Sequence, residues 1–295
     1  MIIVQIINGF GNQLFQYATA RQVARRLGAK LKLDLSAFQR LDFTWQYQLG
    51  YFNDQFEIAT ENELFSVADP YIYHTPGFGF TKKLHVPSFQ SSTHFLERST
   101  LYQDEIEMLT GDQYLEGYFQ SDKYISEIRS ELLAEFKVQP RGVIDLSLLE
   151  RIRQSNSVAL HIRRGDYATN PDISKTYGVC SSDYYQQAIS YIKERVVGAE
   201  LFVFSNDIDW CRRELSFDLP VNYVSGSFEP PVDFYLMSAC KHFVIANSTF
   251  SWWAAWLGDS PDKIVVEPKS FFANFQHMFP DLPEPDLNVD DWIRF

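Results

Sequence analysis

The first residues of the chain change from an apolar run to a helical period and then to strict alternation. Residues 2–7 are apolar except for Gln5 and predict a buried strand, and residues 8–13 form a loop that contains two glycines. Residues 14–27 carry apolar positions at helical spacing and are followed by Gly28, a residue type favoured just after a helix. In residues 31–35 leucine alternates with charged residues, as in a half-buried strand. The opening is therefore predicted to be β-loop-α-β.

The periodic pattern weakens in the middle of the first half and returns before a polar segment. Residues 41–116 show no clear period, so we expect loops and short helices there, in a region suited to setting specificity. Residues 121–136 predict a helix, and the proline-bearing residues 139–142 predict a linker. A chain of 295 residues is long for one core, so we predict two domains, residues 1–145 and residues 146–295.

The second half alternates regularly between strand and helix patterns. One predicted helix has an apolar stripe at Tyr185, Ala188, Ile189, Ile192 and Val196. Alternation of this kind predicts an α/β domain with a parallel sheet covered on both faces, and ligands bind such sheets beyond the carboxyl ends of the strands. The predicted strands are residues 158–162, 201–205, 221–224, 243–246 and 264–267, and the predicted helices are residues 183–196, 209–215, 232–240 and 251–257.

Composition narrows the class of protein. Hydrophobic residues make up 45% of the chain and charged residues 22%, as in globular proteins. The formal charge of -12 argues against general nucleic-acid binding, which needs surplus Lys and Arg. No apolar run is long enough to span a membrane and the start lacks a secretion signal, so we expect a cytoplasmic protein. Cys180, Cys211 and Cys240 are widely spaced and are expected to be reduced and structural.

Basic residues follow the first strand of the second half. Because strand side chains alternate, His161 and Arg163 share a face, and Arg163 can reach past the strand end. Its guanidinium and that of Arg164 offer planar donors that match phosphate oxygens, which in an acidic chain points to one specific anion. The alternative is a structural ion pair between Arg163 and Asp166.

Short polar residues follow the next strand, at Ser205, Asn206 and Asp207. Asp209 is well placed to cap the following helix, and the Asp207 carboxylate can accept hydrogen bonds from a ribose or from guanine. Asp207 and Asp209 also match the D-x-D pattern that binds metal in one glycosyltransferase fold. The metal alternative is weak, because three-residue matches are common and arginine already supplies positive charge.

A third polar segment stands at residues 247–251, just before a tryptophan-rich helix. The hydroxyls of Ser248, Thr249 and Ser251, together with free N–H groups at a helix start, can bind an anion. The alternative is an ordinary helix cap before a core helix. Asn247 also begins a glycosylation pattern, which has no meaning in a cytoplasmic chain.

The loop at residues 8–13 does not fit the dinucleotide fingerprint, because Leu14 stands where that motif needs Gly or Ala. Gly11 still permits close approach of a ligand, and Asn12 and Gln13 at the helix start can bind a phosphate or a sugar hydroxyl.

Together these segments resemble the α-1,2-fucosyltransferase family. The matching segments occur in the same order as in the family and span nearly the whole chain. The sequence departs from the family at residues 8–11, which are Asn-Gly-Phe-Gly where the family commonly has Gly-Gly-Leu-Gly. The matching segments are Asn8 to Tyr17, Gly117 to Ser121, His161 to Tyr167, Phe204 to Asp207 and Asn247 to Trp253.

The resemblance implies a GT-B-like α/β fold: two Rossmann-like halves with parallel sheets and a cleft between them, the acceptor largely on residues 1–145 and GDP-fucose on residues 146–295. It implies no cofactor and no required metal. Arg163 is expected to hold the diphosphate, Asp207 the guanosine, and the Ser248 to Ser251 loop the phosphate or fucose. The wider set of expected donor-binding residues is His161, Arg164, Ser205, Asn206, Asp207, Ser248, Thr249, Phe250, Ser251, Gly11, Asn12 and Gln13.

The implied reaction is inverting transfer of L-fucose from GDP-β-L-fucose to O2 of a terminal galactose in a glycan. Arg163 is expected to be catalytic by stabilising the departing diphosphate, and Asp166 is the candidate base, unless it only orients an arginine. The alternatives are transfer of fucose to another hydroxyl and a non-catalytic nucleotide-sugar or glycan-binding protein. Peripheral association with the inner membrane surface stays open.

Overall fold

The computed structural model describes residues 1–39, 45–52, 55–68, 92–137, 139–224 and 229–295. The chain forms two compact units. Unit 1 comprises Met1–Leu132 and Met278–Leu287, and unit 2 comprises Leu133–His277 and Asn288–Phe295. The division falls after residue 132, whereas the sequence predicted it after residue 145. Residues 278–287 belong to unit 1, although a division into two consecutive segments would place them in unit 2.

Unit 1 is built on a four-stranded sheet in the order β2-β1-β4-β3, in which every pair of neighbours is parallel. Its strands are β1 (Ile2–Gln5), β2 (Leu31–Asp34), β3 (His94–Leu96) and β4 (Gln113–Glu116). Helix α1 (Phe10–Leu27) joins the first two and ends at Gly28, whose φ of 58° is left-handed. The helix begins at Phe10, four residues before the predicted start, because the N–H groups of Asn12 and Gln13 bond back to the Gly9 carbonyl.

The expectation of only loops and short helices over residues 41–116 is wrong for part of that region. It holds helix α2 (Glu61–Val67) and 3-10 turns, but also strands β3 and β4. All four residues of β4 are buried. Because two of them, Gln113 and Glu116, are polar, the strand lacks an apolar pattern in the sequence. Gln113 donates to two backbone carbonyls, and Glu116 pairs with the buried His94 at 3.1 Å. Residues 41–44, 53–54 and 69–91 of the region lie outside the described residues.

The predicted helix at residues 121–136 is divided. Two 3-10 turns, Asp122–Tyr124 and Ser126–Ile128, precede helix α4 (Arg129–Phe136). A further helix, α5 (Leu146–Gln154), follows the predicted linker and is capped by the side chain of Asp145.

Unit 2 contains a six-stranded sheet in the order β10-β9-β8-β5-β6-β7, again with parallel neighbours throughout. Counted along the chain, this is the Rossmann order, in which the first and fourth strands are neighbours at the centre. The strands are β5 (Asn156–Ile162), β6 (Ala199–Ser205), β7 (Val221–Tyr223), β8 (His242–Val244), β9 (Val265–Glu267) and β10 (Ile293–Arg294). The helices are α6 (Gly165–Thr169), α7 (Pro171–Tyr177), α8 (Ser182–Arg195), α9 (Ile208–Glu214), α10 (Pro230–Ser238) and α11 (Thr249–Leu257).

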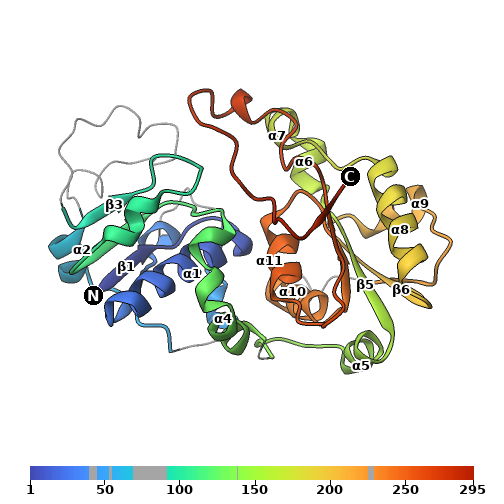
Figure 1. Cartoon of the computed structure of the whole chain (residues 1–295), viewed down its shortest axis with the longest axis horizontal. Helices are drawn as coiled ribbons and strands as arrows, with labels where there is room; N and C mark the ends of the chain where they lie inside the picture. The colour runs from blue at the N-terminus through green and yellow to red at the C-terminus, as the bar shows by residue number, and fades with distance from the viewer. Residues whose placement is uncertain (40–44, 53–54, 69–91, 138, 225–228) are drawn as a thin grey trace. The chain divides into compact units, whose positions relative to one another are not determined.

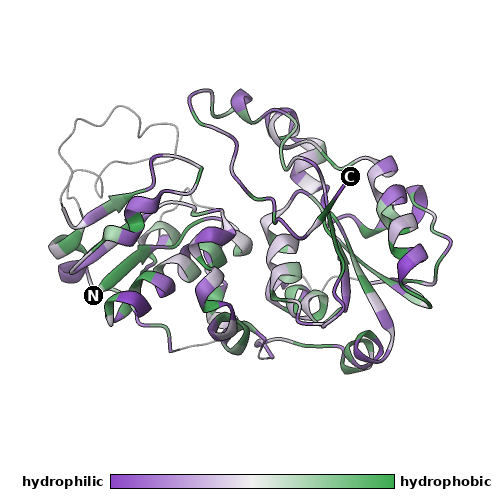
Figure 2. Ribbon diagram, in the orientation of Figure 1, coloured by the Kyte–Doolittle hydropathy of each residue, from purple (hydrophilic) through white to green (hydrophobic). Residues whose placement is uncertain are grey.

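Helices cover both faces of this sheet, as predicted. Helices α8 and α9 lie on one face, and α10 and α11 lie on the other (Figure 1). The stripe predicted on α8 packs into one core cluster with Val158 and Leu160 of β5 and Leu201 and Val203 of β6. Most of β5 is hydrophobic, whereas α8 carries residues of both kinds (Figure 2). The predicted fold class, GT-B-like α/β with two Rossmann-like halves and parallel sheets, is confirmed.

Among the described residues, no helix combines the length and the apolar character needed to cross a membrane. All three cysteines are free thiols in unit 2, and Cys211 and Cys240 are buried.

Candidate functional site

The predicted site residues of unit 2 stand at one edge of its sheet. Strands β5 and β8 are parallel neighbours at the centre, where the chain connections leave in opposite directions. In open parallel sheets, ligands bind beyond the carboxyl ends of the strands at this switch point. Arg163 follows β5 and Ser248 follows β8, so the two predicted anion-binding segments lie at the same edge.

Arg163 is held by an acid and by an aromatic ring. Its Nη2 donates to Oδ1 of Asp166 at 2.5 Å, and its guanidinium carbon lies 4.7 Å from the centroid of the Tyr167 ring. The ion pair considered from the sequence is therefore present. The Arg163 side chain keeps 23% of its surface exposed, so pairing with Asp166 does not remove it from solvent or ligand.

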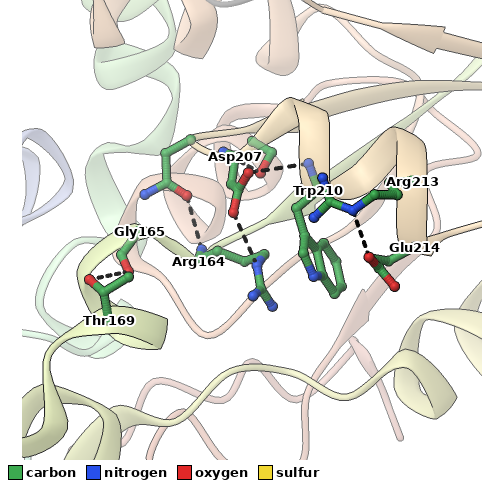
Figure 3. Close-up of polar contacts among 9 residues, drawn as sticks. Arg164, Gly165, Thr169, Asp207, Trp210, Arg213 and Glu214 are labelled. Atoms are coloured by element: carbon green, nitrogen blue, oxygen red, sulfur yellow. Dashed lines mark hydrogen bonds and ion pairs between the residues drawn. The ribbon is translucent and has the colours of Figure 1, made fainter.

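Arg164 is likewise held by an acid and by an aromatic ring (Figure 3). Its Nε donates to Oδ2 of Asp207 at 3.4 Å, and its guanidinium carbon lies 3.7 Å from the centroid of the Trp210 ring. Oδ1 of Asp207 accepts the backbone N–H of Trp210 at 3.2 Å, which makes Asp207 the N-cap of α9. The expectation that Asp209 caps this helix is wrong, because Asp209 lies in the first turn and pairs with Arg212 in solvent.

The turn between β6 and α9 is fixed by its own polar side chains. Oδ1 of Asn206 accepts the backbone N–H of Arg164 at 2.9 Å, and Ser205 Oγ accepts that of Asp207 at 3.0 Å. Gly165 has a φ of 38°, and a Cβ there would lie 2.2 Å from Nδ2 of Asn206. Asn206 therefore joins the loop after β5 to the loop after β6 and holds the arginine segment in place, while Ser205 fixes the turn itself.

The loop after β8 caps α11. Ser248 is the N-cap, with its Oγ accepting the Phe250 N–H at 3.4 Å, and both Ser248 and Thr249 are half-buried. Ser251 is fully buried and donates to the carbonyls of Ala246 and Ser248. Ser248 and Thr249 are therefore partly accessible to a ligand at the helix start. Ser251 is buried and stabilises the turn through its hydrogen bonds.

His161 and Phe250 join the two segments. Their rings lie 5.6 Å apart, so the end of β5 contacts the first turn of α11. Burial, with a smaller contribution from the Arg163 charge, lowers the pKa of His161 to about 3. The imidazole is therefore neutral at physiological pH, and its buried Nδ1 has no hydrogen-bond partner among the described residues.

Asn247 is a structural clamp. Its buried amide donates to the carbonyls of Tyr177, Gly178 and Phe271 at 2.9, 3.3 and 3.3 Å, and its Oδ1 accepts the thiol of Cys180 at 3.5 Å. An amide used in this way is not open to glycosylation.

The remaining predicted residues, Gly11, Asn12 and Gln13, belong to unit 1, in the first turn of α1. Gln13 is fully buried, and its amide bonds to the backbone of Asn8, Gln46 and Gln48, so it shapes the loop. Asn12 accepts from Gln120 at 2.9 Å.

The loop after β1 is thus tied to the loop after β4. Asn8, which has a left-handed φ of 65°, donates from its amide to the hydroxyl of Tyr118. The first two segments of the family resemblance meet in unit 1, and the other three meet in unit 2.

The sequence analysis missed the aromatic partners of the two arginines. Tyr167 and Trp210 were given no role, although each follows its arginine or its carboxylate within one helical turn. For Trp210 the spacing from Asp207 is a signal, because residues three or four apart at a helix start lie on the same side. Tyr167 had no such signal, because Arg163 lies before the start of α6.

Comparison with known proteins identifies the family. Residues 79–281, more than half of the chain, match the family described as Glycosyl transferase family 11. The chain belongs to glycosyl transferase family 11. The family resemblance found from the sequence motifs is confirmed, and the matched stretch contains every predicted site residue of unit 2.

Two of the relatives below have names that state which sugar they transfer, colitose in one and fucose in the other. The chain is 32% identical to the O-antigen biosynthesis glycosyltransferase WbnK of Escherichia coli, over 97% of each chain. It is 29% identical to an alpha-1,2-colitosyltransferase of Escherichia coli, over 100% of this chain and 98% of the relative. It is also 29% identical to galactoside alpha-(1,2)-fucosyltransferase 2 of Oryctolagus cuniculus, over 54% of this chain and 51% of that protein.

Proposed function

We propose that this family 11 glycosyltransferase transfers L-fucose from GDP-β-L-fucose to O2 of a terminal galactose in a glycan, with inversion and without a metal. The observation that supports it most directly is the edge of the unit 2 sheet. There, Arg163 and Arg164 follow β5, and the start of α11 follows the neighbouring strand β8. In a chain of net charge -12, this arrangement suits one anionic ligand of defined shape, such as a nucleoside diphosphate.

Stabilisation of the leaving group is the main catalytic task in this proposal. When the bond from fucose to GDP breaks, negative charge builds on the diphosphate, and donors already aimed at that position lower the barrier. Arg163 supplies a partly exposed guanidinium, and Ser248 and Thr249 stand at the positive end of the α11 dipole. Asp207 is the proposed guanosine contact, although its two oxygens already serve Arg164 and the α9 cap.

The acceptor proton has one candidate base in unit 2. Asp166 bonds to Arg163 through Oδ1, and 40% of its side chain is exposed. The ion pair favours its orienting role, and its proposed second role is to take the acceptor proton through the exposed part of the carboxylate.

The donor sugar has a second candidate. One relative that matches the full length of the chain is named a colitosyltransferase, whereas the galactoside alpha-(1,2)-fucosyltransferase 2 matches about half of it. Colitose is L-fucose without the hydroxyl at C3. A site that hydrogen-bonds a hydroxyl strongly rejects the analogue lacking it, so the two donors are distinguishable by rate.

The decisive experiment supplies GDP-fucose and the corresponding colitose donor, separately and in competition, to the purified protein with a galactose-terminated acceptor. We expect GDP release and an α-1,2-fucosylated product, established by linkage analysis. Preference for the colitose donor would replace fucose in the proposal, and a different linkage would change the acceptor position. Nucleotide binding without turnover of any acceptor would favour a non-catalytic binding protein.

The matched pair of variants is Arg163→Ala and Arg212→Ala. Loss of one preorganised donor typically lowers the rate about 10²- to 10³-fold, so Arg163→Ala is expected to lose turnover with its fold intact. Arg212 also pairs with an aspartate three residues away, but in solvent on α9, so its variant should keep full activity. Equal activity in the two variants would remove Arg163 from the mechanism.

A further inference from the structure

The two neighbouring arginines of the site are held by the same combination of groups. Each guanidinium contacts one carboxylate and one aromatic face: Asp166 and Tyr167 for Arg163, and Asp207 and Trp210 for Arg164. The distances from guanidinium carbon to ring centroid, 4.7 and 3.7 Å, lie within the range of a cation–π contact. The carboxylate restrains one edge of the guanidinium, and the ring restrains its plane.

The Tyr167 ring is itself fixed. It stacks on Tyr177 with centroids 4.9 Å apart and an interplanar angle of 25°, and Tyr177 contacts Phe272 at 5.2 Å. The carbonyl of Tyr177 accepts the amide of Asn247, which lies beside the N-cap of α11. Burial raises the pKa of Tyr167, so its ring stays neutral and offers an electron-rich face to Arg163 at physiological pH.

Trp210 is fixed by the residue that also holds Arg164. Asp207 accepts the backbone N–H of Trp210 with one oxygen and Nε of Arg164 with the other (Figure 3). The indole plane and the carboxylate therefore belong to one short segment at the start of α9. Neither can shift without disturbing the guanidinium between them.

We propose that Tyr167 and Trp210 are positioning residues, which hold the guanidinium planes of Arg163 and Arg164 in place before a diphosphate binds. The inference rests on the proposed function and deepens it. An arginine side chain loses about 2 kcal/mol of rotamer freedom when it becomes ordered, and a ring that orders it beforehand removes part of that loss from ligand binding.

The test replaces each ring by an aliphatic side chain and by a smaller aromatic one. The variants are Tyr167→Leu, Tyr167→Phe, Trp210→Leu and Trp210→Phe. Calorimetry measures their affinity for GDP and for inorganic pyrophosphate, and kinetics with the donor measures kcat and KM. We expect the Leu variants to bind GDP roughly 2- to 30-fold more weakly and Trp210→Phe to stay near wild type. Tyr167→Phe keeps the ring face but removes the hydroxyl that bonds to Arg163, so its affinity should lie between that of Tyr167→Leu and that of wild type. Met variants serve if a Leu variant does not fold.

The chain offers a matched control at Tyr191. The guanidinium carbon of Arg195 lies 3.6 Å from the centroid of that ring, a comparable stack on α8 that involves no residue of the site. Tyr191→Leu should therefore leave nucleotide affinity and kinetics unchanged. The thermal unfolding temperature of every variant separates loss of stability from loss of positioning.

A double-mutant cycle shows whether each ring acts through its arginine. If it does, Trp210→Leu adds little to the loss already caused by Arg164→Ala, and Tyr167→Leu adds little to that of Arg163→Ala. Additive losses, or Leu variants that bind GDP as well as wild type, would overturn the proposal. So would a wild-type protein that binds neither GDP nor pyrophosphate. A protein that binds GDP but does not transfer fucose would defeat the proposed function alone, since the affinity comparison still tests the rings.

Discussion

The buried imidazole of His161 makes the stability of unit 2 dependent on pH. Burial lowers its pKa in the folded protein to about 3, below the ordinary value of 6.5. As the pH falls below about 6.5, the unfolded chain takes up a proton on this residue that the folded protein does not, so folding stability is lost. We expect His161→Phe to remove this dependence, because the new ring keeps a contact with Phe250 and cannot be protonated.

The magnitude follows from the two pKa values. With 6.5 unfolded and about 3 folded, the single site lowers the free energy of unfolding by about 1.4 kcal/mol at pH 5.5 and about 2 kcal/mol at pH 5.0. At pH 7.5 this contribution vanishes, because the residue is neutral in both states. There, wild type and variant differ only by packing and by loss of the unsatisfied Nδ1, which costs the wild type about 1–3 kcal/mol while it stays buried.

The assay is urea unfolding of both proteins between pH 5.0 and 7.5, followed by tryptophan fluorescence. Five of the six tryptophans, all except Trp45, lie in unit 2, so the signal reports on the unit that contains His161. As the pH falls, the free energy of unfolding of the variant should rise relative to that of wild type by the amounts given above. A difference between the two proteins that stays constant over this range would show that His161 is not held neutral by burial, and the account of this part of the site would fail.

Three further outcomes follow from the same geometry. Gly165→Ala should lower the free energy of unfolding by about 1–3 kcal/mol and weaken GDP binding, because its φ of 38° and the nearby Asn206 amide leave no room for a Cβ; unchanged urea and calorimetric titrations would contradict this. Asn247→Leu should lower the unfolding temperature, since three buried carbonyls lose a donor, and an unchanged temperature would show that water replaces it. Turnover should persist in EDTA, because Arg163 and Arg164 supply the positive charge; a rate restored only by added Mg²⁺ or Mn²⁺ would return Asp207 and Asp209 to consideration as ligands.

The regular half of the chain is predictable because its chemistry follows its topology. Alternating strand and helix patterns after residue 156 predict parallel strands, and parallel strands place all their carboxyl ends at one edge. The sequence pattern alone therefore predicts that Arg163, Asp207 and Ser248 lie at the same edge of the sheet. It does not predict the strand order, since periodicity does not show which strands are neighbours.

The first half is harder to predict because two of its strands, β3 and β4, do not show the apolar run or the alternation that predict β1 and β2. In β4, Gln113 and Glu116 are buried together with polar partners, and two of these, the Ser92 carbonyl and His94, lie more than twenty residues away in sequence. A local window registers these residues as polar and assigns a loop. The start of α1 was missed for a related reason, because Asn12 and Gln13 were considered as ligand contacts while the buried Gln13 holds the surrounding backbone.

A sequence motif gives the residue types of a site but does not show which atom of each residue bonds to which partner. The run from His161 to Tyr167 suggested two neighbouring phosphate-binding arginines with one acid, Asp166, close behind them. In the structure, each of the two arginines has its own acid and its own ring, and Asp207 both caps α9 and restrains Arg164. Because one carboxylate performs both tasks, Asp207→Ala should reduce helix stability and nucleotide affinity together. Asp207→Asn can still accept the Trp210 N–H and should separate the two effects, keeping the cap and losing the charge that restrains Arg164.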